Sequence, residues 1–405
     1  MAGAATEKLY LRDSYTVAFD AAVVSCEPHD DGTFDVVLDK SFFYPESGGQ
    51  LADRGRIAGA EVTAVTEDDA GRVHHGAATR VDAGPVRCEV DWEVRFDHMQ
   101  QHTGQHVLSR AFVETADMDT ISFHMGEESC TIDVDGDSLD EKVVTRVERL
   151  ANSILWENRK VKIKTVSPLQ VREPLLRKPL PDGVAEIRLV EIDGFDVIGC
   201  CGTHVRRVGE LGLIKVSKFE KIKGANRVHF KVGARALDDY AIRHEIVKQL
   251  ANRFTTAPGS VIEKVDKMHS DAQRSRKEVQ RLARKLATFE AGGLLEAGEV
   301  HNGCTVVTEV LGDAGEDYLR LLSAELKKNE GTLSIVASVQ GLVLCNAAAD
   351  VDVDLPGPVV ERARSIGGSG GGKSGFATVR LPQGAAVSPF VNEVAALLKS
   401  RVKRR

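Results

Sequence analysis

The sequence has 405 residues, of which 42% are hydrophobic and 28% charged, as expected for a folded protein of two or three domains rather than a small disulfide-bonded scaffold. No apolar run reaches the roughly 20 residues that cross a bilayer, and the start, MAGAATEKLYLRDSY, has no apolar signal segment, so we expect a cytoplasmic protein without a membrane partner. The formal net charge of -7 argues against a protein that coats DNA or RNA without specificity.

Residues 1–93 are predicted to form a β-rich N-terminal domain. Short alternating stretches such as TVAFDAAVVSCEP and GTFDVVLDKSFFYP are bounded by Gly, Asp and Pro about every ten positions. This pattern favours a small antiparallel barrel or sandwich.

Residues 94–235 are predicted to form a second, α+β domain. MQQHTGQHVLSRAFVETA has helical apolar spacing, TISFHMGEESCTIDVD alternates like a hairpin, and residues 139–156 again have helical spacing. Strands return in EIRLVEID, GLIKVSKFEKIK and NRVHFKVG. The chain as a whole is therefore expected to be α+β.

Residues 236–296 are predicted to be a helical hairpin or linker, and residues 297–405 a small α/β domain with a glycine-rich loop. Apolar residues from Val265 to Phe289 recur in steps of three and four, which indicates a seam of about four heptads. A hairpin packed on its own chain is favoured over a coil between two chains, so both a monomer and a homodimer stay open.

Basic residues are concentrated in the second half of the chain. Residues 206–231 hold eight Lys and Arg against two Glu, a further basic set lies within residues 274–285, and the chain ends KSRVKRR. Any one of these basic runs could simply form a solvent-exposed face of the protein. Three such runs in the same half of the chain favour a polyanionic partner that approaches from the C-terminal half.

Two short motifs are predicted to share one zinc ion. His102 and His106, in HTGQH, are four apart on a helix and therefore share a face, while Cys200 and His204, in GCCGTH, have the same spacing in a loop. Together they offer a Cys/His₃ set, with Cys201 as the alternative thiolate. His98 and His124 lack a partner at ligand spacing and are expected to support the site or contact substrate.

Four motifs together resemble a known family. They are RFDHMQQHTGQHVLS, CCGTHV, FFYPESGGQLADRG and GGSGGGKSG. In this order they resemble the freestanding alanyl-tRNA editing proteins of the long AlaX-like form, which are similar to the editing and C-terminal parts of alanyl-tRNA synthetase. No segment resembles the ATP-binding domain of a synthetase. The resemblance implies a hydrolase that removes serine, and as a further candidate glycine, from tRNA(Ala), with one zinc ion per chain on His102, His106, Cys200 and His204.

The resemblance also implies roles around the zinc ion. Ser122, with Thr120 on the same strand, is expected to recognise the serine hydroxyl, and Thr103 and Gln105 are grouped with them as specificity residues. Thr103 stands where zinc peptidases of the H-E-x-x-H type carry their glutamate base, which argues against a peptidase. Thr103 is also expected to leave room for a charged tRNA end. The catalytic base is not assigned. Gly48, Gly49 and Gln50 are expected to shape the entry for the tRNA 3′ end.

The glycine-rich segment 367–375 is expected to belong to a tRNA-binding domain. Its sequence matches the G-x-x-x-x-G-K-[ST] motif of a phosphate-binding loop. However, the following segment GFATVRLP is predicted to be a strand and not the helix that this motif requires, so ATP binding is disfavoured. Lys373 and Arg380 are the expected phosphate contacts. Two alternatives remain, a tRNA-binding module with a structural zinc ion and a deacylase for Ser-tRNA(Thr), as in the editing domain of threonyl-tRNA synthetase.

Overall fold

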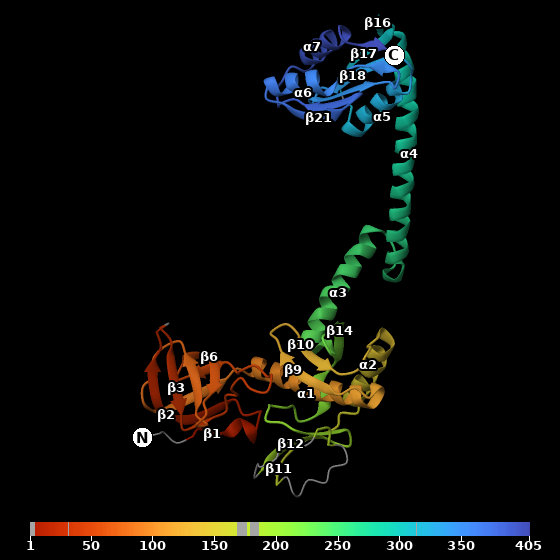
Figure 1. Ribbon diagram of the computed structural model, residues 1–405. Coiled ribbons are helices and arrows are strands. Elements are labelled where there is room, and N and C mark those ends of the chain that lie inside the picture. The colour runs from red at the N-terminus through yellow and green to blue at the C-terminus, as the bar shows by residue number, and fades with distance from the viewer. Residues whose placement is uncertain (1–4, 31, 168–175, 179–185, 313) are drawn as a thin grey trace. The chain divides into compact units, whose positions relative to one another are not determined.

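A computed structural model describes residues 5–30, 32–167, 176–178, 186–312 and 314–405. The chain divides into two compact units, residues 1–249 and 250–405. Figure 1 shows the elements of each unit. No described helix is long and apolar enough to cross a membrane.

A closed six-stranded barrel begins the first unit, and it confirms the predicted barrel. Its strands run in the order β2-β3-β7-β6-β5-β8, and each neighbouring pair is antiparallel. A short parallel pair, β1 (Glu7–Lys8) with β4 (Lys40–Ser41), lies beside them. The barrel strands are β2 (Ala18–Pro28), β3 (Phe34–Leu38), β5 (Gly55–Ile57), β6 (Ala60–Glu67), β7 (Val73–Ala77) and β8 (Gly84–Val90).

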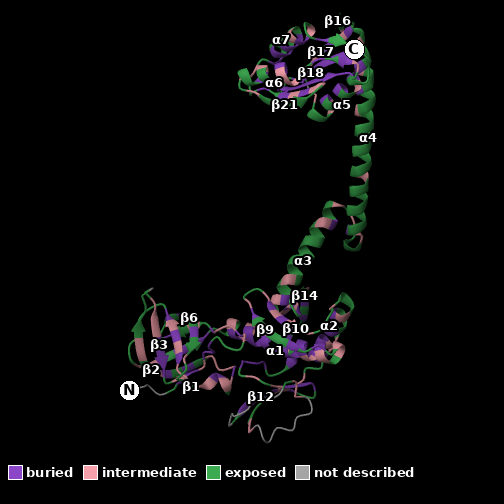
Figure 2. Ribbon diagram, viewed as in Figure 1, coloured by how far each residue is buried: buried purple, intermediate pink, exposed green. Residues whose placement is uncertain are grey.

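The helix that carries HTGQH is α1 (Trp92–Ala116), which confirms the predicted helix. Asp91 caps its N-terminus by accepting the backbone N–H groups of Glu93 and Val94, and Asp117 ends it in the left-handed conformation at a φ of 52°. Fifteen of its residues are buried, including the whole of HTGQH (Figure 2). The two histidines of this motif therefore face the interior of the first unit and not its outer surface.

A four-stranded antiparallel sheet packs against α1 and α2 (Glu141–Trp156), with the strand order β14-β15-β10-β9. Its strands are β9 (Thr120–Met125), β10 (Cys130–Val134), β14 (Ile214–Ile222) and β15 (Ala225–Val232). Gly104 lets α1 approach this sheet closely, because a Cβ there would lie 2.5 Å from Cγ2 of Val232. A second antiparallel sheet consists of β11 (Val161–Val166), β12 (Ile187–Ile192) and β13 (Asp196–Gly199).

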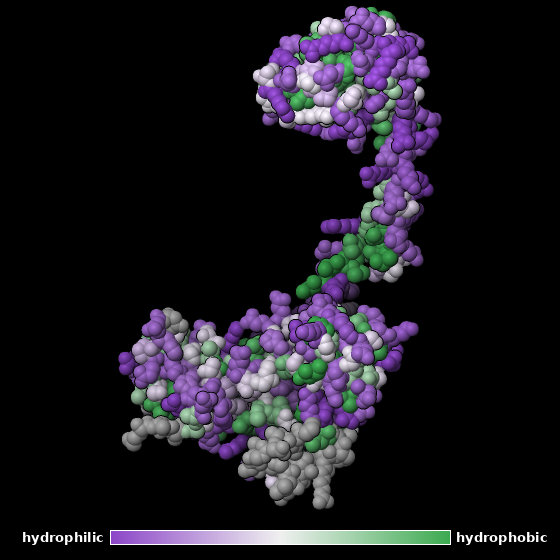
Figure 3. Space-filling view, viewed as in Figure 1, coloured by the Kyte–Doolittle hydropathy of each residue, from purple (hydrophilic) through white to green (hydrophobic). Residues whose placement is uncertain are grey.

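The helices of residues 234–296 carry many exposed apolar side chains. They are α3 (Ala234–Arg253) and α4 (Val261–Glu296). On α4 the predicted seam is exposed, from Val265 at 37% to Phe289 at 82%, and α4 meets the core of the second unit through Ala287 and Ala291. Figure 3 shows apolar atoms gathered over α3, where Leu237, Ile242 and Ile246 are exposed.

The second unit is a three-layer α/β fold around a six-stranded sheet of order β16-β17-β18-β19-β22-β21. Helix α5 (Glu316–Lys327) packs with the end of α4 in one hydrophobic cluster, and α6 (Pro356–Ser365) and α7 (Val387–Lys399) pack in another. The strands are β16 (Glu299–His301), β17 (Cys304–Leu311), β18 (Thr332–Ser338), β19 (Leu342–Ala347), β21 (Ser369–Lys373) and β22 (Phe376–Arg380), and β20 (Val351–Asp352) pairs separately with β23 (Lys403–Arg404).

The prediction that the glycine-rich segment forms a loop is wrong for most of its length. Ser369 to Lys373 form strand β21, which pairs with the predicted strand β22 in an antiparallel hairpin. The partner strand supplies the backbone hydrogen bonds that hold the glycines extended despite their low strand propensity. Gly375 turns the hairpin at a φ of 72°. The strand–loop–helix arrangement of an ATP-binding loop is thus not formed by this segment.

Candidate metal centre

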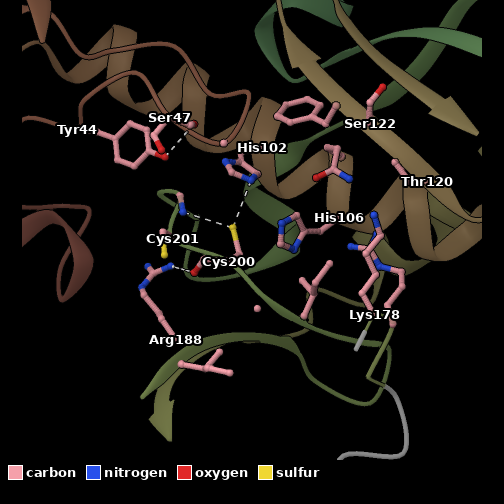
Figure 4. A pocket seen from close by; sticks show the side chains of 18 of the residues that line it. Tyr44, Ser47, His102, His106, Thr120, Ser122, Lys178, Arg188, Cys200 and Cys201 are labelled. Carbon is pink, nitrogen blue, oxygen red and sulfur yellow. Dashed lines mark hydrogen bonds between the residues drawn. The ribbon is translucent and has the colours of Figure 1, made fainter. Parts of the chain in front are cut away.

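The two predicted ligand pairs converge at one point of the first unit. His102 and His106 come from α1, and Cys200 and His204 come from the loop after β13. One ligand atom from each of the four residues lies within 4.8 Å of all the others. Figure 4 shows the sulfur of Cys200 beside His102 and His106. Of the two candidate thiols, the structure brings Cys200 to the histidines.

The distances among these donors suit a small tetrahedral metal ion. Sγ of Cys200 lies 3.4 Å from Nε2 of His102 and 3.3 Å from Nε2 of His204. The bond lengths of a zinc ion with nitrogen and sulfur ligands imply a nitrogen–sulfur separation of about 3.5 Å. Nδ1 of His106 is buried and has no hydrogen-bond partner, so no protein group binds this nitrogen. The donor set therefore fits zinc.

Protein groups fix the rings of two of the histidines. Nδ1 of His102 lies 2.6 Å from Oε1 of Gln50, and Nδ1 of His204 lies 3.0 Å from Oγ1 of Thr103. When Nδ1–H donates to these oxygens, the lone pair of each Nε2 faces Cys200, which is the ring orientation that a metal ligand needs.

Burial sets the protonation of the free donors. It lowers the pKa of His102 to about 3, and it lowers the pKa values of His106 and His204 well below the usual range. These imidazoles are therefore neutral, as metal binding requires. Burial also raises the pKa of the Cys200 thiol to about 11, so the free site holds a thiol that loses its proton when a metal ion binds.

Thr103 does not face a substrate, and the expectation that it leaves room for one is wrong. Its side chain is fully buried, and its hydroxyl accepts a hydrogen bond from the backbone N–H of Val205 as well as meeting His204. Gly202 lines the cavity beside the metal centre and packs closely against His102, because a Cβ there would lie 2.1 Å from Cε1 of His102. Both small residues allow close packing around the ligands.

Gln50 was expected to shape the substrate entry, but it does not line the cavity and instead contacts His102. It is fully buried, and besides meeting His102 it donates from Nε2 to Oγ1 of Thr203 and accepts from the backbone N–H of Thr203. Its neighbour Gly49 lies against β9, where a Cβ would be 2.5 Å from the carbonyl oxygen of Phe123. Gly48 lines the cavity beside the metal centre. Of this motif, Gly48 is thus the part that reaches the cavity.

A cavity of about 600 Å³ opens beside the four donors. His102, His106, Cys200 and the exposed Cys201 line one part of it, and β9, β12 and β13 contribute the rest. Cations in the described lining are Arg177, Lys178 and Arg188; the described carboxylate is that of Glu186. The space and the polar wall suit a small polar ligand next to the metal centre.

Ser122, Thr120 and Gln105, the other expected specificity residues, line this cavity in different ways. The hydroxyl of Ser122 donates to Asp133 at 2.8 Å, and Figure 4 shows it pointing away from His102. Thr120 is buried, and its hydroxyl lies 2.6 Å from Oγ of Ser109, which also meets Nε2 of Gln105 at 2.7 Å. The amide oxygen of Gln105 has no protein partner among the described hydrogen bonds. Gln105 is therefore the expected residue whose free polar atom is best placed for a ligand.

His98 and His124 lie apart from the donors. His98 is buried at a separate cavity with Asp97 and Arg235, and His124 is exposed on β9. Among the described residues, neither histidine side chain forms a hydrogen bond with one of the four donors, so the structure gives no support to the expectation that they assist the metal centre.

Known proteins match this chain over most of its length. A family model described as the threonyl and alanyl tRNA synthetase second additional domain matches residues 187–228, which include the Cys200–His204 loop. "Alanyl-tRNA editing protein Aarsd1" of Rattus norvegicus is 31% identical, with 90% of this chain and 91% of that protein covered. The chain belongs to the alanyl-tRNA editing protein family.

Two further relatives agree with this assignment. "Alanyl-tRNA editing protein AlaX-L" of Pyrococcus horikoshii is 30% identical, with 93% of this chain and 94% of the relative covered. "Alanine--tRNA ligase" of Ignicoccus hospitalis is 29% identical over 99% of this chain, which spans 44% of the ligase. The resemblance found in the four motifs is thus confirmed.

The expected phosphate contacts lie on the glycine-rich hairpin of the second unit. Lys373 ends β21 and is exposed. Arg380 ends β22, and its Nη2 lies 2.9 Å from a carboxylate oxygen of Glu316. An exposed ion pair of this kind is worth little and opens readily to another anion.

Sequence reasoning missed Gln50 as a partner of His102, Ser109 as a partner of Gln105, and Arg188. Gln50 and Ser109 carried no signal, because each acts through a contact that only the folded chain forms. Arg188 did carry one, since it is a charged residue inside the apolar strand Ile187–Ile192. Burying a charge in such a position costs free energy unless the charge is paired and hydrogen-bonded.

Proposed function

We propose that this protein hydrolyses the ester bond of serine attached to tRNA(Ala), and that a zinc ion held by His102, His106, Cys200 and His204 is its cofactor. Membership of the editing family supports the class of substrate. The observation that carries the proposal is the convergence of the four donors, three of which (His102, His106 and Cys200) line a cavity of about 600 Å³.

A zinc ion held by these four residues would supply a Lewis acid next to the cavity. An aminoacyl ester is more reactive than a peptide, so its hydrolysis does not require the glutamate base that Thr103 replaces. The protein's own contribution is to hold the ligand rings in place. Gln50 and Thr103 do this from outside the cavity.

Recognition of serine is assigned to the amide of Gln105. Ser109 holds one end of this amide, so its other end is directed to the cavity that Gln105 lines. A serine hydroxyl can exchange a hydrogen bond with that free end, whereas the methyl group of alanine leaves it unpaired. An unpaired buried polar group costs about 1–3 kcal/mol, which is the discrimination that an editing site needs. Ser122 and Thr120 form the rest of this wall.

The polyanionic partner is proposed to be the tRNA itself. The hairpin with Lys373 and Arg380 presents exposed cations in the second unit, and the basic run of residues 206–231 lies in the first. Neutralised phosphates make such binding sensitive to salt. Truncation after residue 296 should therefore weaken tRNA affinity and reduce its dependence on salt; unchanged affinity would remove the second unit from the binding surface.

The test is a deacylation assay with the full-length protein and one equivalent of zinc. Ser-tRNA(Ala), Gly-tRNA(Ala) and Ala-tRNA(Ala) are compared under one condition. Release of serine well above the buffer rate, with Ala-tRNA(Ala) spared, is the expected result. Serine release at the buffer rate would refute the proposed function, and the Gly-tRNA(Ala) arm decides whether glycine is a second substrate.

One observation favours a structural zinc ion as a second candidate. Four protein donors fill a tetrahedral shell, as they do in structural zinc sites. In that case the protein would be a tRNA-binding module. His102→Ala separates the two possibilities, because loss of a structural ion would unfold the first unit, whereas loss of an editing centre would abolish hydrolysis and leave the circular dichroism spectrum unchanged.

A different tRNA is the other alternative, because the matching family model is described for both threonyl and alanyl synthetases. Ser-tRNA(Thr) should therefore be a fourth arm of the same assay. Faster serine release from Ser-tRNA(Thr) than from Ser-tRNA(Ala) would reassign the substrate without changing the site.

A further inference from the structure

Arg188 is a buried cation that the protein itself leaves incompletely paired. Its side chain comes from β12 and the residue is 8% exposed. Nε donates to the carbonyl oxygen of Leu11 at 3.1 Å, and Nη1 donates to the carbonyl oxygen of Cys200 at 2.6 Å. Nη2 is buried and has no hydrogen-bond partner. No described carboxylate forms an ion pair with this guanidinium, in contrast to the buried Arg177, which pairs with Asp196.

Such an arrangement is costly without a further partner. A buried charge is normally paired, and an unsatisfied donor on a charged group costs more than one on a neutral group. The two carbonyl oxygens hold the guanidinium in one orientation but do not neutralise it. The missing partner is therefore an anion, and a guanidinium binds phosphate oxygens especially well.

The place of Arg188 in the cavity indicates which part of a substrate it meets. Arg188 lines the same cavity as the zinc donors. In Figure 4 it lies with Cys201 on one side of Cys200, whereas Thr120 lies on the other side of the cluster. The wall with Thr120 and Gln105 is the one assigned to the amino acid. An aminoacyl-adenosine that places its amino acid there and its ester at the donors extends its nucleotide away from that wall.

We propose that Arg188 is a phosphate-binding residue, which holds the phosphate on the 5′ side of the terminal adenosine of the charged tRNA. This inference rests on the proposed function and adds a binding subsite to it. Arg188 anchors the phosphate through Nη2, while its bonds to the Cys200 and Leu11 carbonyls keep the guanidinium from turning away.

The test uses two stable analogues in which an amide replaces the ester. They are 3′-seryl-amino-3′-deoxyadenosine and the same compound with a 5′-phosphate, and their affinities for the zinc-loaded full chain are measured by calorimetry. A charged hydrogen bond corresponds to a gain of about ten- to a hundredfold in affinity. The wild-type protein should bind the phosphorylated analogue more tightly by that factor.

Arg188→Met should bind both analogues equally, with the affinity of the wild type for the unphosphorylated one. Arg188→Lys keeps the charge without the fork of donors and should retain a few-fold gain. Lys178→Met, which removes another cation of this cavity, is the matched control and should keep the full gain. Zinc content by mass spectrometry shows whether each variant keeps its metal centre, and Arg188→Lys serves as the test variant if Arg188→Met loses it.

A phosphate gain in Arg188→Met equal to that of the wild type would overturn the proposal. It would also be overturned if the wild type showed no gain while still releasing serine from Ser-tRNA(Ala), since the proposed function would then stand without this subsite. If the wild type neither binds the unphosphorylated analogue nor releases serine, the proposed function fails, and this inference fails with it.

Discussion

The side-chain oxygen of Gln50 lies 2.6 Å from Nδ1 of His102, although 52 residues separate them along the chain. Gln50 belongs to the segment between β4 and the barrel strand β5, and His102 belongs to α1. The barrel region thus reaches the metal centre directly. Gln50 of this region meets a candidate metal ligand, and Gly48 lines the cavity.

Gln50→Leu should weaken zinc binding, because Nδ1 of His102 loses its acceptor and the ring is free to turn. Loss of such an outer partner typically costs about 10–100-fold in metal affinity. Competition with a chromogenic chelator measures the affinity. Gln50→Glu keeps an acceptor oxygen and serves as the control. Equal affinities for Gln50→Leu and the wild type would show that the contact does not orient the ligand.

Thr103→Val should have a similar effect through His204. The substitution keeps the shape of the buried side chain but removes the hydroxyl that lies 3.0 Å from Nδ1 of His204. Thr103→Ser retains the hydroxyl and should stay close to the wild type. We expect zinc affinity to fall about tenfold or more in Thr103→Val. If Thr103→Val binds zinc with the affinity of the wild type, the contact between Thr103 and His204 does not orient the ligand.

Ser109→Ala should reduce the preference for serine over alanine. Ser109 holds the amide of Gln105, and without it the free end of that amide is no longer directed to the cavity. We expect the ratio of kcat/KM for Ser-tRNA(Ala) over Ala-tRNA(Ala) to fall about tenfold.

Gln105→Leu should lower the ratio by a similar factor, and the double variant should lower it no further, since both residues act through one hydrogen bond. Additive losses, or an unchanged ratio in Ser109→Ala, would assign serine recognition to other residues, with Ser122 the next candidate.

The barrel should become less stable in mild acid because of His75. Nδ1 of this buried ring donates to the carbonyl of Val36 and Nε2 lies 2.9 Å from Oγ of Ser41, and burial lowers its pKa to about 4. In the unfolded chain its pKa is about 6.5. Between these values the unfolded chain binds more protons, so the free energy of unfolding falls as pH falls through 6.5, by roughly 2 kcal/mol at pH 5.

Denaturant unfolding from pH 8 to pH 5, with zinc in excess, measures this effect. His75→Gln should remove that part of the pH dependence. Ser41→Ala keeps the titrating ring and should show the wild-type slope. An identical slope in His75→Gln would show that His75 does not titrate on unfolding.

Local patterns predicted much of this structure. The barrel strands, α1, the β9–β10 hairpin and the strands that flank GCCGTH follow from alternation and helical spacing within short segments. The four candidate metal donors could be picked out for the same reason, since each pair is defined by a spacing of four within one helix or one loop. The two pairs are brought together by a contact between segments about a hundred residues apart. The sequence indicated this contact only because both pairs consist of typical metal-ligand residues.

Contacts between distant segments were not predictable in this way. Thr103 follows His102 directly, yet neighbours on a helix point in different directions, so Thr103 meets His204 and not the cavity. The glycines of β21 have little strand propensity, and only the partner strand β22 makes them extended. The charge of Arg188 inside an apolar strand was visible in the sequence, but its contact with the carbonyl of Cys200 forms only in the folded chain.

The most direct test of the central claim is a zinc titration of the metal-free protein, followed by the rate of serine release from Ser-tRNA(Ala). We expect no release above the buffer rate without zinc, a linear rise to one equivalent per chain, and no rise in a variant with both His102→Ala and Cys200→Ala. Full activity of the metal-free protein, or a linear rise in that double variant, would contradict the central claim.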